Sequence, residues 1–123
     1  MWKVLIADDE PKIRKGLRNS VNWPELDMEV VGEAEDGEVA LEIAKNARPD
    51  IILVDICMPF LDGLQLIEKL NDMLKGCIII VVTGHDEFAY AQKALKLRVF
   101  DYILKPVSRE QLRSVLNKAR EEL

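Results

Sequence analysis

Five side chains that could do chemistry stand at or just after the ends of apolar segments in this chain: Asp8, Asp9, Asp55, Thr83 and Lys105. Adjacent carboxylates repel each other unless something positive sits among them. Three carboxylates, with one histidine in the whole chain and no thiolate pattern, favour a hard, oxygen-seeking cation. Mg²⁺ fits best because it binds one or two carboxylates, keeps several waters and accepts phosphate oxygens as further ligands.

The hydroxyl and the ammonium extend this interpretation to a phosphoryl group. Thr83 would supply a hydrogen-bond donor and Lys105 a point charge for its oxygens. A carboxylate beside a divalent cation can attack phosphorus and form an aspartyl phosphate. Asp55 is the candidate nucleophile because it lies centrally in the predicted set.

The elements that must position these groups alternate between strands and helices. Two apolar runs, 51–54 and 78–82, are apolar at every position, which is typical of strands covered on both faces. The predicted strands are 2–7, 28–34, 50–55, 77–83 and 99–105. Between and after them, apolar residues follow the three-and-four spacing of amphipathic helices: Ile13, Leu17 and Val21; Val39, Ile43 and Ala47; Leu64, Ile67, Leu70 and Leu74; Phe88, Ala91 and Leu95; Leu112, Val115, Leu116 and Ala119.

Helix starts are marked by Pro11 in a first turn and by two capping-box spacings, Asp62 with Gln65 and Ser108 with Gln111. Five βα units predict an α/β fold: a doubly wound five-stranded parallel sheet, (βα)5 and flavodoxin-like, with strand order 2-1-3-4-5 and helices on both faces.

This fold predicts that the five side chains meet at one edge of the sheet. Ligand sites of such sheets lie beyond the carboxyl ends of the strands, where the strand order reverses. Neighbouring strands are about 4.8 Å apart, so Asp9 and Asp55 could share one ion. Lys105, two strands from Asp55, would need the full reach of its side chain.

Composition limits the class of protein. A chain of 123 residues, 49% hydrophobic and 32% charged, is expected to form one domain. A net charge of -5 without a basic cluster argues against a nucleic-acid surface. No apolar run approaches the roughly 20 residues of a membrane span, and the start of the chain lacks a signal-peptide layout, so we expect a cytoplasmic protein without membrane partners. Cys57 and Cys77 are expected to be reduced thiols.

Four motifs together resemble the receiver domain of two-component response regulators: "LIADDEP", "IILVDICMPFLDGL", "IIVVTGHDEFAYAQKAL" and "DYILKPV". The resemblance covers essentially the whole chain. It implies a regulatory phosphoacceptor, not a true enzyme, that assists its own Mg²⁺-dependent phosphorylation and dephosphorylation. The donor would be a sensor histidine kinase, and phosphorylation would change the face of the fourth helix, fifth strand and fifth helix to favour a homodimer or an output.

The resemblance also implies a role for each site residue. Asp55 would be phosphorylated, Asp9 would bind Mg²⁺ directly, Asp8 would bind it through water, and the main-chain carbonyl of Cys57 would be a further ligand. The remaining roles are that Thr83 bonds the phosphoryl group, Lys105 pairs with it, Tyr102 swings inward with Thr83, and the Lys105–Pro106 bond is cis. Kinase recognition would involve exposed positions of the first helix, around Arg14, Arg18 and Asn19.

The segments "NWPELDMEVVGEAEDG" and "TGHDEFAYAQKALKL" are similar to the subgroup whose receivers precede an AraC-type helix-turn-helix domain. We expect residues 1–123 to be one receiver without an output domain, so DNA would be reached only through a domain absent from this chain. We favour an N-terminal piece of a longer regulator, and a stand-alone receiver is the alternative. Two residues depart from the pattern: Arg98 replaces a usual glycine, which would be strained in a left-handed turn, and His85 stands where tyrosine is common.

Two other classes of function fit parts of the pattern. A hydrolase with an aspartyl-phosphate intermediate commonly needs an acid two residues after the nucleophile, where this chain has Cys57. A flavin or nucleotide carrier would have glycines and free amides after the first strand, where this chain has acids that repel an unaccompanied phosphate.

Overall fold

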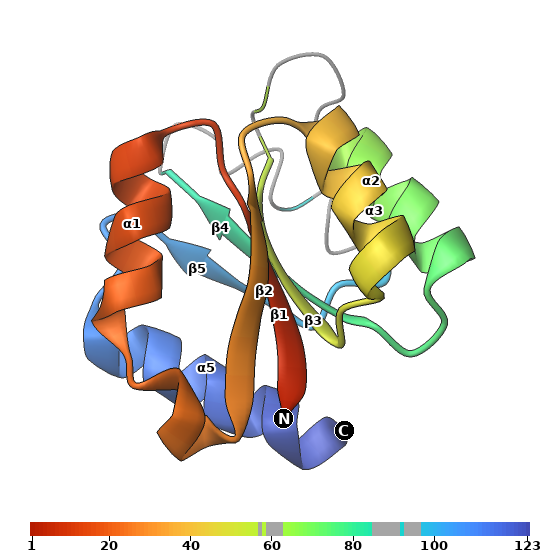
Figure 1. Ribbon diagram of the computed structural model, residues 1–123. Coiled ribbons are helices and arrows are strands. Elements are labelled where there is room, and N and C mark those ends of the chain that lie inside the picture. Colours follow the sequence, from red (N-terminus) through yellow and green to blue (C-terminus); the bar gives the residue numbers. More distant parts are fainter. Residues whose placement is uncertain (57, 59–62, 85–91, 93–96) are drawn as a thin grey trace.

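Five parallel strands form one sheet in the computed structural model, in the order β2-β1-β3-β4-β5 (Figure 1). The structure describes residues 1–123 except 57, 59–62, 85–91 and 93–96. The predicted strand order and parallel pairing are confirmed. The strands are β1 Trp2–Ala7, β2 Met28–Ala34, β3 Ile51–Asp55, β4 Ile78–Thr83 and β5 Asp101–Leu104.

Helices cover both faces of the sheet, as predicted. In Figure 1, α1 and α5 lie on one side of the sheet, and α2 and α3 lie on the other. Among the helices that the structure describes, none is long and apolar enough to span a membrane. The predicted helical segment with Phe88, Ala91 and Leu95 lies mostly outside the described residues. The described helices are α1 Pro11–Ser20, the 3-10 turn η1 Trp23–Leu26, α2 Gly37–Ala47, α3 Gly63–Met73 and α5 Arg109–Glu122.

Two apolar layers explain why β3 is apolar at successive positions. Ile52 and Val54 belong to the layer under α2 and α3, whereas Ile51 and Leu53 belong to the layer under α1 and α5. Successive residues of a strand point to opposite faces, so a strand buried on both sides has no polar face. Each large aliphatic side chain buried in this way contributes about 1.5 to 3 kcal/mol.

The apolar stripes of the helices agree with the prediction at α5 and differ at α2. All four predicted positions of α5 are buried. In α2, Ala40 and Ala44 are buried, whereas the predicted Val39 and Ile43 pack at the margin of the core. Small residues on the buried side let the helix lie close to the sheet. A Cβ atom at Gly32 on β2 would already come within 2.9 Å of Ile43 Cγ2.

Two predicted helix starts are confirmed. Pro11 opens α1, and Ser108 Oγ accepts a hydrogen bond of 3.0 Å from the backbone N–H of Gln111 at the start of α5. Such caps satisfy backbone donors that have no partner within the helix. Asp62 lies outside the described residues.

The turn before β5 avoids the strain that Arg98 would suffer in a left-handed conformation. In the described part of the chain, the non-glycine residues with positive φ are Asp27 and Arg48. Arg98 is not one of them. The side-chain amide of Asn71 on α3 faces the backbone N and O of Arg98, both at 3.3 Å in the amide orientation that satisfies both groups.

Cys77, just before β4, is expected to be an unreactive thiol. Burial, with a smaller contribution from the charge of Asp50, raises the pKa of Cys77 from its ordinary value of 9.0 to about 12. Because the thiolate is the reactive form, at pH 8 this thiol should react with iodoacetamide at least about tenfold more slowly than in urea-unfolded protein. Peptide mass spectrometry would follow Cys77 separately from Cys57, which lies outside the described residues. Equal rates in folded and unfolded protein would contradict this prediction.

Candidate functional site

The three predicted carboxylates meet at the carboxyl-terminal edge of the sheet. Asp55 ends β3, and Asp8 directly follows β1, whose Ala7 pairs with Val54. Oxygen atoms of Asp8, Asp9 and Asp55 lie within 4.8 Å of one another. Asp8 and Asp55 are buried, with 1% and 3% of their surface exposed, whereas Asp9 is exposed. The parallel sheet thus brings these acids together, as the strand order predicted.

Lys105 reaches the same acids from the end of β5. Its Nζ lies 3.1 Å from Asp8 Oδ2 and 3.4 Å from Asp55 Oδ2. The backbone N–H of Lys105 donates to the carbonyl of Thr83 at 2.7 Å, which continues the β4–β5 pairing to this point. The Lys105–Pro106 peptide is cis, as the resemblance implied. One ammonium therefore bridges two buried carboxylates.

Burial and charge oppose each other at Lys105. Burial lowers the pKa of its ammonium, but the charges of Asp55 and Asp8 outweigh this effect and raise the pKa overall. A raised lysine pKa means that the favourable interactions are fully present below the ordinary value and are lost only as the pH rises through the higher one. Lys105 is therefore positively charged at neutral pH.

Asp8 is held both by the backbone and by Lys105. Its Oδ1 accepts a hydrogen bond of 2.9 Å from the backbone N–H of Glu10. Its Oδ2 is buried and forms the ion pair with Lys105, but receives no hydrogen bond of good geometry. Burial raises the pKa of Asp8, and the Glu10 hydrogen bond and the charge of Lys105 offset this only in part. In this arrangement Asp8 retains a proton more readily than an exposed aspartate does.

These residues fit a divalent cation. The carboxylates provide oxygen ligands within one small volume, and Asp8 Oδ2 is a buried acceptor with unused capacity. Oxygen ligands are what Mg²⁺ and Ca²⁺ prefer, and a cation among them would favour the charged form of each acid. The acidic cluster is consistent with a metal site on both counts.

Thr83 and Tyr102 lie on one face of the sheet. Thr83 ends β4 and is fully buried. Val81, two residues earlier, pairs with Tyr102 on β5, and partners in register share a face, as do residues two apart along a strand. Tyr102 is partly buried against the layer under α2 and α3. The two side chains are therefore directed to the same side of the sheet.

Gly63 brings the start of α3 directly against the end of β3. Its backbone N–H donates to the carbonyl of Ile56 at 2.6 Å. A Cβ atom at this position would lie 2.4 Å from Ile56 Cα and 2.6 Å from the backbone oxygen of Asp55. Gly63 therefore allows a close approach that involves the backbone of Asp55. Cys57, Pro59 and His85 lie outside the described residues.

Arg14 is a neighbour of the site, and its predicted exposure is wrong. It was expected to be exposed with Arg18 and Asn19, but its side chain is only 15% exposed. Its Nη1 donates to the backbone carbonyl of Asp8 at 2.6 Å, and its Nε lies 3.6 Å from Glu33 Oε1. Glu33 lies near the end of β2, which is next to β1 in the predicted strand order. An acid at that strand end was the signal that could have indicated a partner for Arg14.

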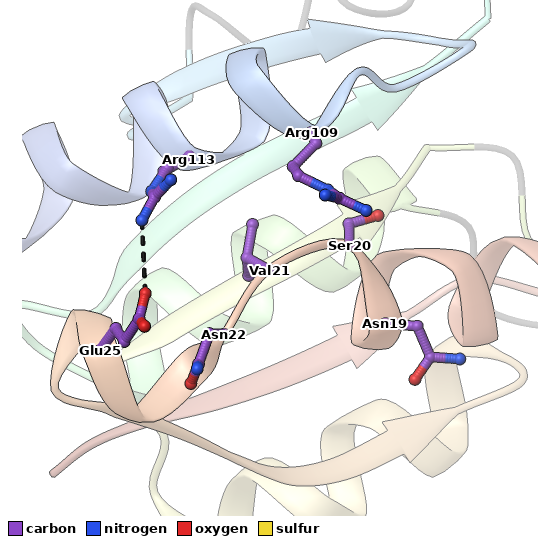
Figure 2. Close-up of a pocket in the computed structure, with 7 residues that line it drawn as sticks. All are labelled: Asn19, Ser20, Val21, Asn22, Glu25, Arg109 and Arg113. Carbon is purple, nitrogen blue, oxygen red and sulfur yellow. Dashed lines mark hydrogen bonds and ion pairs between the residues drawn. The ribbon is translucent and has the colours of Figure 1, made fainter.

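A cavity of about 380 Å³ lies away from the acids, at the opposite end of α1 (Figure 2). Its lining residues come from the end of α1, η1 and the start of α5. Arg113 points across it to Glu25, with 3.4 Å between Nη2 and Oε2. Both side chains are more than half exposed, so this ion pair adds little stability. The acids at the sheet edge, and not this cavity, carry the candidate chemistry.

These features define a class of α/β domains: a doubly wound sheet carries an acidic site suited to a metal ion at its carboxyl edge. A buried threonine and a lysine complete that site. The Response regulator receiver domain family matches residues 4–117, and the chain belongs to this family. Domains of this family are generally phosphoacceptors without enzymatic activity of their own. The predicted family is confirmed.

Curated relatives are longer than this chain. YesN of Bacillus subtilis (strain 168), described as an uncharacterized transcriptional regulatory protein, is 37% identical over 123 residues, which cover 100% of this chain and 33% of YesN. The transcriptional regulatory protein HptR of Staphylococcus aureus (strain N315) is 36% identical over 119 residues, which cover 96% of this chain and 46% of HptR. The chain thus spans less than half the length of these relatives.

Solved structures agree with the predicted subgroup. The REC domain of AraT, a response regulator from Geobacillus stearothermophilus, is 54% identical with a TM-score of 0.96, covering 98% of this chain and 94% of that one. A two component transcriptional regulator AraC from Clostridium phytofermentans is 30% identical with a TM-score of 0.91, covering 99% and 95%.

Proposed function

We propose that this domain is a phosphorylation-controlled switch in which Asp55 accepts a phosphoryl group in a Mg²⁺-dependent reaction. The observation that carries the proposal is the cluster of carboxylate oxygens within 4.8 Å, bridged by Lys105. An aspartate nucleophile, metal-binding acids and a cation for the phosphoryl oxygens are what acyl-phosphate formation requires.

In the transfer step, a carboxylate oxygen of Asp55 forms a bond to phosphorus while the P–N bond of a kinase phosphohistidine breaks. The imidazole nitrogen keeps the electron pair of that bond and takes a proton. Mg²⁺ would be held by Asp9 and Asp55 directly, by Asp8 through water and by the main-chain carbonyl of Cys57. When bound, the ion would neutralise charge on the phosphoryl oxygens and so favour attack by Asp55 on phosphorus.

After transfer, Lys105 and Thr83 would hold the phosphoryl group. Lys105 already lies 3.4 Å from Asp55 Oδ2, so it needs little movement to pair with an added phosphoryl oxygen. Thr83 would bond another oxygen, and Tyr102 on the same face would turn inward. The face of the fourth helix, β5 and α5 would then favour dimerisation or an output.

The partners follow from this chemistry and from the relatives. We assign phosphoryl donation to a sensor histidine kinase, in a cytoplasmic setting. The named functions of YesN and HptR support control of transcription by the whole protein. DNA contact would belong to a domain outside residues 1–123, since the net charge of these residues is -5.

Thr83→Ala should separate phosphorylation from the switch. The variant should still accept a phosphoryl group, because Asp55 and the other acids are unchanged, but Tyr102 should no longer respond because the hydroxyl that links it to the site is gone. The measurement is the ¹⁹F resonance of fluorotyrosine at position 102 in a Tyr90→Phe background, together with dimerisation. Thr83→Ser, which keeps the hydroxyl, is the control. Equal activation of Thr83→Ala would contradict the coupling.

Intact mass after incubation with acetyl phosphate tests the proposed function. We expect the protein to gain the mass of one phosphoryl group when Mg²⁺ is present and not when it is chelated, and we expect Asp55→Asn to gain none. Asn keeps the shape of the side chain but removes the nucleophilic carboxylate. Rapid catalytic consumption of the donor would favour a hydrolase instead, and a gain that does not need Asp55 would contradict the assignment.

A further inference from the structure

Arg14 is a partly buried arginine that contacts the acidic loop without being one of its acids. Its guanidinium makes two contacts, one with the backbone carbonyl of Asp8 at 2.6 Å and one with Glu33 at 3.6 Å. Arg18, one turn further along α1, also pairs with Glu33, at 2.6 Å. The planar fork of an arginine suits it to bridge two acceptors in a fixed geometry.

The carbonyl of Asp8 belongs to the same peptide unit as the N–H of Asp9. Peptide units are planar, so holding this carbonyl in place also fixes the orientation of the Asp9 N–H and the direction in which the chain enters Asp9. Asp9 is exposed, so burial does not hold its carboxylate near Asp8 and Asp55. A donor on the Asp8 carbonyl therefore restricts the one acid of the cluster that burial does not hold.

Glu33 holds the other side of the guanidinium. It lies on β2 opposite Ile6 of β1, one residue before the end of that strand. The sheet thus anchors the arginine, and the arginine in turn anchors the loop. We propose that Arg14 is a positioning residue for the metal-binding acids: it orders the Asp8–Asp9 peptide, with Glu33 as its anchor.

The proposal rests on the proposed function, because it assumes that these acids bind Mg²⁺. A positioning role and a purely electrostatic role of Arg14 predict opposite changes in Mg²⁺ affinity when Arg14 is replaced. The positive charge of a guanidinium near the acids opposes a cation, so loss of charge alone would tighten Mg²⁺ binding. Loss of positioning would weaken it, because the acids would have to be ordered when the ion binds.

The experiment compares Arg14→Gln, which removes the charge, with Arg14→Lys, which keeps it but cannot form the same fork. Arg18→Gln is the matched control because Arg18 shares Glu33 but is not the donor to Asp8. Mg²⁺ affinity is measured by titration, and exchange of the Glu10 amide, which donates to Asp8 Oδ1, is measured by NMR without metal. Thermal unfolding confirms that each variant is folded.

We expect both Arg14 variants to bind Mg²⁺ roughly tenfold more weakly, as for other changes around metal ligands, and to exchange the Glu10 amide faster. Arg18→Gln should leave both quantities within about twofold of the unmodified protein. Unchanged or tighter binding by Arg14→Gln, or an equal loss in Arg18→Gln, would overturn the proposal. If the unmodified protein does not bind Mg²⁺, the proposed function fails, and unchanged Glu10 exchange in the Arg14 variants would then overturn the role of Arg14 separately.

Discussion

Gly63→Ala is expected to destabilise the fold by about 3 kcal/mol, the upper part of the usual range for overpacking. The added Cβ atom would lie 2.4 Å from Ile56 Cα and 2.6 Å from the carbonyl oxygen of Asp55. Both atoms belong to backbone at the end of a buried strand, so neither can move aside as a flexible side chain could. Urea unfolding followed by tryptophan fluorescence would measure the loss.

Gly16→Ala is the matched control for this substitution. Gly16 is also helical, in α1, but a Cβ atom there would have nothing within 4 Å. Alanine is favoured over glycine in helix interiors, so Gly16→Ala should stabilise the protein by roughly 0.5 to 1 kcal/mol. The folded fraction of Gly63→Ala should also bind Mg²⁺ more weakly, because α3 can move away only by shifting the backbone that carries Asp55. A stability change below about 1 kcal/mol for Gly63→Ala would contradict the tight contact.

Lys105→Ala is expected to abolish the phosphorylation-dependent response and to lower stability in a pH-dependent way. The ammonium lies 3.1 Å from Asp8 and 3.4 Å from Asp55, both buried. Without it, the two carboxylates lose their shared partner, which should cost about 1 to 3 kcal/mol at neutral pH in metal-free protein. The phosphoryl group would also lose the ammonium predicted to pair with it.

The direction in which the stability of Lys105→Ala changes with pH follows from the pKa of Asp8. Burial already raises its pKa, and the charge of Lys105 opposes that rise. Removing Lys105 should raise the pKa further, so the folded variant should bind a proton more strongly than its unfolded chain does. Its stability should therefore decline as the pH rises through the range between the two pKa values. The difference from the unmodified protein should be small near the ordinary pKa of an aspartate and should grow as the pH rises through the raised pKa of Asp8.

Denaturant unfolding at several pH values, with and without Mg²⁺, measures this effect. Lys118→Ala, at an exposed position of α5, is the control and should show almost no change. Mg²⁺ should restore part of the lost stability in Lys105→Ala, because the ion replaces the missing positive charge. A pH-independent loss, or a normal response of the phosphorylated variant, would contradict the role assigned to Lys105.

The sheet was predictable because its signal is local. Unbroken apolar runs identified β3 and β4 as strands buried on both faces, and alternating helical segments then restricted the order of the strands. The stripe of α2 was predicted less well, because Val39 and Ile43 are the larger apolar residues. The helix instead turns Ala40 and Ala44 to the core, and that choice depends on how closely it approaches the sheet.

The site was predictable as a set, and its details were not. Strand order alone was enough to bring Asp8, Asp55 and Lys105 together, because carboxyl ends of parallel strands share one edge. Arg14 was assigned to the exposed face of α1 because its burial depends on Glu33, which is 19 positions further along the sequence. Contacts of this kind appear only when side chains from neighbouring elements are placed in space.

Asp55, among three clustered acids, is the residue proposed to receive the phosphoryl group. The most direct measurement is borohydride trapping after incubation with acetyl phosphate and Mg²⁺, followed by tandem mass spectrometry. Reduction converts an aspartyl phosphate to homoserine and so marks the residue permanently. We expect homoserine at position 55 and aspartate at positions 8 and 9. Homoserine at either of those positions, or none in the chain, would contradict the account.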